Sequence, residues 1–72
     1  MFEFGERLKK IRQENNLTQK QFAARVGITE RGVQRYEAGE RKPTFDVIIS
    51  ILDNVNVDAN YLLGRSNNPA RL

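Results

Sequence analysis

Residues 17–43 read LTQKQFAARVGITERGVQRYEAGERKP, and this stretch decides the fold. Thr18 and Thr29 each precede a short helical pattern, where a threonine oxygen can accept a free backbone N–H at the start of a helix. Gln21 completes a T-x-x-Q capping box with Thr18. Gly27 lies between the two patterns and suits the left-handed conformation that ends many helices. The sequence therefore predicts two short helices joined by a tight turn, over residues 19–26 and about 30–38.

The helix expected over about 30–38 has two different faces. At about 100° per residue, its polar side chains gather on one arc: Glu30, Arg31, Gln34 and Arg35. The rest of its surface is a narrow seam of Gly32, Val33 and Tyr36. Because an amphipathic helix buries its apolar seam, we expect the polar arc to face solvent. Tyr36 is then a core residue rather than a platform on which bases stack.

Helical patterns flank this pair on both sides. A first helix is expected over about 3–15, where apolar residues repeat at the spacing of one helical face. A fourth is expected over about 45–54, with Thr44 as its N-cap, and a short fifth follows Asp58 and ends at Gly64. No strand pattern is present. The sequence thus predicts an all-α domain over residues 1–64 and a tail or the start of a linker over 65–72.

The fourth helix has a wide apolar arc, formed by Phe45, Val47, Ile48, Ile49, Ile51, Leu52 and Val55. A central helix buried on most sides has such an arc, and we favour that interpretation for most of it. The alternative is an outer edge, at Val47 or Ile49, that contacts a second subunit. A dimer contact near the fifth helix and the tail belongs to the same alternative.

Composition narrows the classes of function. The 72 residues include neither cysteine nor histidine, so thiolate metal sites and the commonest acid–base catalyst are excluded, and no cofactor is expected. An enzyme is not expected, because Ser50 is placed on an outer helix face, Ser66 in the tail, and no glycine-rich phosphate loop is present. No apolar run reaches the length of a membrane span and no signal-peptide pattern follows Met1, so we expect a cytoplasmic protein. The net charge of +3 weakly favours a polyanionic partner.

Two short capped helices joined by a glycine-containing turn form a helix-turn-helix, whose second helix enters the DNA major groove. On that helix Arg31 and Arg35 can bond guanine through two acceptors, Gln34 can pair with adenine, and Glu30 can accept from cytosine. The alternative for these side chains is an ordinary solvated helix face. For Glu30, a favourable interaction with the helix dipole is an equal alternative.

Over about residues 4–64 the chain resembles the lambda-repressor-like, Cro/cI-type helix-turn-helix proteins, also called the XRE family. The matching stretches are LKKIRQENNLTQKQFAARVGI, TERGVQRYEAGERKPTF and VDANYLLGR. Their ordered set of T-Q-x-x-x-A, G-I-T, Y-E-x-G and a later proline is a specific signal. The resemblance implies a compact five-helix bundle that binds operator DNA, mostly as a homodimer, in bacterial or phage transcriptional repressors.

The resemblance also assigns residues to the DNA backbone. The family's phosphate-contacting positions match Gln19, Thr29, Arg41 and Lys42, and the glutamine at the position of Gln19 also braces the recognition helix there. To these we add two residues at the start of the second helix, Lys20 and Thr18, although Thr18 is expected to act mainly as a cap. Arg41 and Lys42 have the alternative of being plain loop charges.

A helix-one arginine that pairs with the glutamate closing the recognition helix matches Arg12 and Glu37.

One departure from the family pattern is Gly32, where serine, threonine or alanine is common. A glycine there would permit a close approach to the second helix or to a sugar-phosphate strand.

The sequence supports two functions of different classes. The first is a transcriptional regulator, mainly a repressor, that reads a palindromic operator in double-stranded DNA as a dimer. The second is a protein-interaction module on the same fold, such as an antitoxin. A toxin-binding extension is expected in the second case, and only about eight residues follow Gly64, so we favour the regulator. Neither function involves a membrane or a small-molecule ligand.

Overall fold

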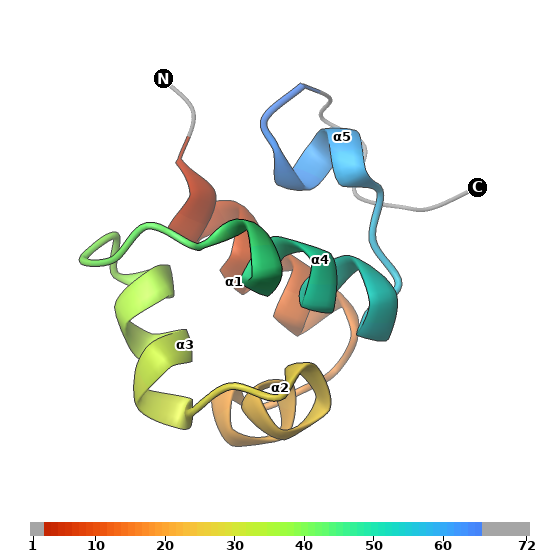
Figure 1. Ribbon diagram of the computed structural model, residues 1–72. Coiled ribbons are helices and arrows are strands. Elements are labelled where there is room, and N and C mark those ends of the chain that lie inside the picture. The colour runs from red at the N-terminus through yellow and green to blue at the C-terminus, as the bar shows by residue number, and fades with distance from the viewer. Residues whose placement is uncertain (1–2, 66–72) are drawn as a thin grey trace.

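The computed structural model describes residues 3–65, and these contain five helices and no strand. The helices are α1 (Phe4–Glu14), α2 (Gln19–Val26), α3 (Glu30–Glu37), α4 (Phe45–Asn54) and α5 (Ala59–Leu62). They form a bundle of 27 × 24 × 20 Å in which α5 lies at the opposite end from α2 (Figure 1). The all-α, five-helix prediction is confirmed. Residues 66–72 of the tail or linker predicted over 65–72, with Ser66, lie outside the described residues.

Side-chain caps begin four of the five helices. The side chains of Thr18, Thr29, Thr44 and Asp58 each accept a hydrogen bond from a backbone N–H in the first turn of the helix that follows. Thr18 also forms the complete capping box with Gln21. These caps satisfy backbone donors that a helix leaves unpaired, so short helices can begin at defined residues.

The core lies between α1, α2, α3 and α4, and α5 closes it with Tyr61 and Leu62. Its largest fully buried side chains are Leu8, Ile11, Phe22, Val33, Ile51, Val57 and Leu62. Tyr36 is buried as predicted, and its ring meets that of Phe4 edge to face, with centroids 6.3 Å apart. Helix α3 packs against both α2 and α1, which fixes the direction of its remaining face.

The close packing of α1 on α3 depends on Gly5. A Cβ atom at this position would lie 2.5 Å from the carbonyl oxygen of Tyr36 and 2.6 Å from that of Glu37. No real side chain tolerates such distances to backbone atoms. The first turn of α1 therefore passes directly over the last turn of α3, a contact that sequence reasoning did not anticipate.

The prediction that most of the apolar arc of α4 is buried is only partly right. Ile51 is its only buried residue within the helix, and Val47, Ile48 and Leu52 are half-buried. Phe45 is 75% exposed, and Ile49 is also exposed. The reason is that α4 packs chiefly against α2, and one neighbour covers only one side of a helix.

Ser50 does not occupy an outer face, contrary to the prediction. Its hydroxyl donates a hydrogen bond to the backbone carbonyl of Val26, in the last turn of α2. Carbonyls at a helix end have no partner within the helix. Ser50 therefore joins α4 to α2 as a structural residue.

Arg7 holds α5 against α1. Its Nη1 donates to the carbonyl oxygen of Tyr61 at 2.9 Å, and its guanidinium lies 4.7 Å from the centroid of the Tyr61 ring. A cation over an aromatic face is attracted by the ring quadrupole. This role of Arg7 is not visible in the sequence, because 54 positions separate the residue from its partner. Within residues 3–65, no helix has both the length and the apolar character needed to cross a bilayer.

Candidate nucleic-acid interface

The polar arc of α3 faces solvent as its helical wheel predicts. Arg31, Gln34 and Glu30 are exposed and Arg35 is half-buried, while Val33 is buried on the opposite side. The four polar residues line one surface hollow of about 530 Å³, together with Ala38 and Glu40. Two arginines and a glutamine thus share one accessible concave surface. Within residues 3–65, these three side chains form no ion pair or hydrogen bond with one another or with other residues.

The turn between α2 and α3 sets this presentation. Gly27 adopts the left-handed conformation, with φ of 85°, and its N–H donates to the carbonyl of Ala23 at 2.8 Å. Thr29 then begins α3 by accepting a hydrogen bond from the N–H of Gly32 at 2.9 Å. A Cβ at Gly32 would lie 3.1 Å from the Thr29 hydroxyl oxygen. The nearest neighbours of Gly32 are therefore Thr29 and Tyr36, and not helix α2.

A hydrogen-bonded ion pair anchors the end of α3. Arg12 Nε donates to Glu37 Oε2 at 2.7 Å and Arg12 Nη2 to Oε1 at 3.1 Å, so the predicted pair is present in bidentate form. The side chains of Arg12 and Glu37 are only 12% and 6% exposed. Arg12 Nη1 also donates to the carbonyl oxygen of Leu17 at 3.0 Å, a contact that sequence reasoning missed.

Gln19 joins the same network from α2. Its Nε2 donates to Glu37 Oε1 at 3.1 Å. This bond braces the last turn of α3, as the resemblance implies. An amide nitrogen carries two protons, so Gln19 retains one donor for a phosphate oxygen. The carboxylate of Glu37 therefore ties together α1, α2 and α3.

The other residues assigned to the DNA backbone lie at the surface. Thr18, Lys20 and Thr29 are exposed around the start of α2 and α3, and Arg41 and Lys42 are exposed in the loop after α3. Thr18 uses both its N–H and its hydroxyl oxygen in the capping box. Only its hydroxyl proton is then left to meet a phosphate. The lysine and arginine side chains have no such commitment in the described structure.

The chain folds back over the end of α3 through Gly39. This residue is left-handed, with φ of 77°, and its N–H donates to the carbonyl of Tyr36 at 3.2 Å. The next N–H, that of Glu40, donates to the carbonyl of Arg35 at 2.9 Å. These two bonds form a Schellman motif, which brings Glu40 into the hollow beside Arg35. Glu40 had no predicted role from the sequence.

Comparison of this chain with other proteins supports the helix-turn-helix arrangement. Residues 8–62 match a protein-family profile described as Helix-turn-helix. The chain belongs to the helix-turn-helix family. Among its relatives is the uncharacterized HTH-type transcriptional regulator YqaE of Bacillus subtilis, to which this helix-turn-helix chain is 42% identical over 65 residues. The aligned region covers 89% of this chain and 56% of that protein. It is 37% identical over 60 residues to the cryptic phage CTXphi transcriptional repressor RstR of Vibrio cholerae, covering 83% and 54%.

The chain spans about half the length of the curated relatives it matches. Among solved structures, the helix-turn-helix fold is shared with the restriction-modification controller protein C.AhdI from Aeromonas hydrophila. The TM-score is 0.77 at 25% identity, over 83% of this chain and 91% of that one. The P22 c2 repressor, solved with a synthetic operator, has a TM-score of 0.81 at 20% identity, over 92% and 100%. The lambda-repressor-like fold is therefore confirmed.

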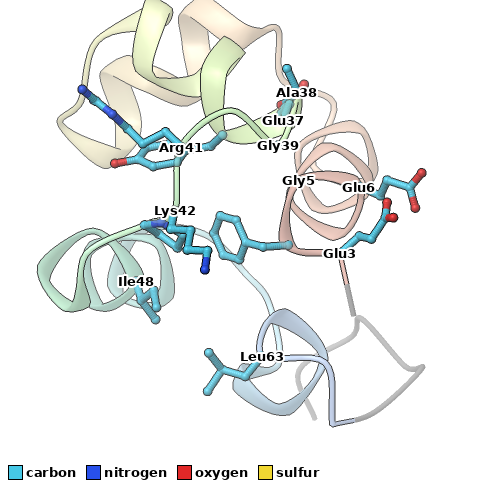
Figure 2. A pocket seen from close by; sticks show the side chains of 13 residues that line it. Glu3, Gly5, Glu6, Glu37, Ala38, Gly39, Arg41, Lys42, Ile48 and Leu63 are labelled. Atoms are coloured by element: carbon cyan, nitrogen blue, oxygen red, sulfur yellow. The ribbon is translucent and has the colours of Figure 1, made fainter. Parts of the chain in front are cut away.

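A second concave surface of the helix-turn-helix chain lies beside the loop after α3. This groove of about 680 Å³ is formed by the start of α1, the loop, α4 and α5, with Phe4, Ile48 and Leu63 among its apolar lining (Figure 2). Arg41 and Lys42 also line it.

Within residues 3–65, histidine, cysteine, aspartate and glutamate side chains form no cluster that could hold a metal ion.

Proposed function

We propose that this chain is a sequence-specific DNA-binding regulator of transcription, acting as a repressor, that inserts α3 into the major groove of its operator. The observation that carries the proposal is the orientation of α3. Its Arg31/Gln34/Arg35 side is accessible, whereas Val33 and Tyr36 hold the other side in the core. The relatives described as transcriptional regulators and a repressor support the same function.

Base reading follows from the donors and acceptors that α3 presents. Arg31 and Arg35 would donate to O6 and N7 of guanine, and Gln34 would donate to and accept from adenine. Glu30 can only accept a hydrogen bond, and the exocyclic amine of cytosine is the donor that we assign to it. This face supplies the choice of sequence.

Phosphate contacts would supply most of the affinity. Gln19 and Thr29 lie around the start of the two motif helices, and Lys20 and Thr18 lie beside them. Arg41 and Lys42 follow the recognition helix in the loop. Each basic group that neutralises a phosphate releases condensed counterions, so binding should weaken steeply as salt rises.

A homodimer on DNA completes the proposal. Successive major grooves on one side of the duplex are about 34 Å apart, and the described part of each subunit measures 27 × 24 × 20 Å. Two copies side by side can therefore place one α3 in each groove. Two-fold symmetry of the protein would then require a palindromic operator.

Selection of bound sites from random duplex DNA, followed by a salt titration on the selected site, tests this function. We expect a two-fold symmetric consensus and an observed affinity that falls with a log–log slope of about −0.9 for each phosphate contacted. Recovery of unrelated sequences after repeated rounds would contradict sequence-specific binding. An asymmetric consensus would contradict the dimer.

Two alanine variants separate base contacts from phosphate contacts. Arg35→Ala should cost about 1–3 kcal/mol on the operator and relax the preference at one position of the site, because a bidentate guanine contact is lost. Lys42→Ala should weaken operator and random DNA alike and make the salt slope shallower by about one unit. Fluorescence anisotropy on both duplexes measures these effects. An equal loss on both duplexes for Arg35→Ala would contradict its assignment as a base reader.

A further inference from the structure

The hollow on α3 includes a carboxylate that base reading and phosphate contact do not use. Glu40 lines it together with Arg35. The N–H of Glu40 is bonded to the carbonyl of Arg35 at 2.9 Å. Gly39 has the left-handed conformation that this return of the chain requires. The position of Glu40 relative to the recognition helix is therefore fixed by the fold.

The hollow also has a small residue in its lining. Ala38 lines the same hollow and lies three positions after Arg35, on the same face of the helix. Its methyl group is the shortest side chain in the lining, so it takes up little of the hollow. Glu40 is exposed and Arg35 is half-buried, so neither side chain is locked in the core.

The chemistry of arginine gives this carboxylate a use. A guanidinium has five N–H donors, and the edge of a guanine accepts only two hydrogen bonds from it. In a major groove closed by the protein, the remaining donors lose water and need another acceptor. A carboxylate is the strongest acceptor for such donors, and its planar geometry matches the guanidinium.

We propose that Glu40 is a positioning residue for DNA specificity: its carboxylate orients Arg35 toward guanine and opposes the capture of Arg35 by phosphate. The inference rests on the proposed function. It gives Glu40 opposite effects on two kinds of DNA. On the operator, Glu40 would stabilise the complex by accepting a hydrogen bond from Arg35, a contact that the two side chains do not make in the chain without DNA. On random duplex, where Arg35 would otherwise bind any phosphate, the same negative charge weakens binding.

The test compares Glu40→Gln with the wild-type chain on the selected operator and on a random duplex of equal length, at one salt concentration. Loss of one negative charge near phosphates should tighten binding to the random duplex by about threefold, as a charge separation of several ångströms in water implies. On the operator, the variant should instead bind about threefold to tenfold more weakly, because a charge-assisted hydrogen bond to Arg35 becomes a neutral one. The ratio of the two affinities should therefore fall by about tenfold or more.

Glu14→Gln is the matched control. Glu14 is exposed at the end of α1, away from the hollow, and its replacement changes the net charge by the same amount. It should change both affinities by less than about twofold. In an Arg35→Ala background, Glu40→Gln should no longer weaken operator binding, because the group that Glu40 positions is gone.

The outcomes separate the two proposals. If Glu40→Gln changes both affinities in the same direction, Glu40 acts only through net charge and the inference is overturned. The same conclusion follows if operator binding weakens equally with and without Arg35. A wild-type chain that binds both duplexes equally would overturn the proposed function, and the inference with it.

Discussion

Arg12→Ala is expected to lower the free energy of unfolding by about 3–5 kcal/mol. The substitution leaves the carboxylate of Glu37, which is only 6% exposed, without its bidentate partner. It also removes the donor to the carbonyl oxygen of Leu17. A single core in a domain of this size supplies only about 3–5 kcal/mol of net stability. The variant should therefore be largely unfolded at room temperature, as measured by circular dichroism in a urea titration.

Two further variants identify the cause of that loss. Arg25→Ala removes an equal charge from an exposed position on α2 and should change stability by about 0.5 kcal/mol or less. In the double variant Arg12→Met/Glu37→Leu no unpaired charge is left in the interior, so it should be more stable than Arg12→Ala alone. A loss below about 1 kcal/mol for Arg12→Ala would mean that the pair behaves like an exposed surface ion pair.

Gly5→Val is expected to destabilise the fold by about 3 kcal/mol, the upper end of the usual range for overpacking. Even the first added atom, Cβ, would lie 2.5 Å from the carbonyl oxygen of Tyr36. That oxygen belongs to the backbone of α3, so relief requires the two helices to move apart. The same movement would strain the ion pair between Arg12 and Glu37. A lower melting temperature and weaker operator binding should appear together.

Lys10→Val provides the comparison for this variant. It introduces the same β-branched residue on an exposed position of the same helix. Its cost should be no more than about 0.7 kcal/mol, the range of helix propensity among ordinary residues. If the two valine variants were equally stable, then α1 would not depend on close contact with α3.

Local signals predicted the fold well, and long-range contacts set the limit of the prediction. The caps at Thr18, Thr29, Thr44 and Asp58 involve residues three positions apart, so the sequence shows both partners together. The outward arc of α3 follows from helical periodicity alone. Arg7 contacts Tyr61, and Ser50 contacts Val26. Both contacts depend on how helices that are distant in sequence pack together, and no periodic pattern in the sequence predicts that packing.

The exposure of Phe45 and the position of Glu40 were missed for different reasons. An apolar arc shows that a helix can be buried, but it does not say how many neighbours will cover it, and α4 packs chiefly on α2. Glu40 reaches the hollow because Gly39 is left-handed. A glycine just past the end of a predicted helix signals that conformation, so the position of the next residue was within reach of sequence reasoning.

The carboxylate of Glu37 holds three helices together through Arg12 and Gln19, and within the described residues none of the solvent-facing side chains Arg31, Gln34 and Arg35 takes part. The residues that hold the fold together are thus different from the residues proposed to read the DNA. With the three side chains as the proposed base readers, mutations at their positions would change the preferred operator with little penalty for folding. A lineage could then acquire new targets one substitution at a time while its intermediates stay folded.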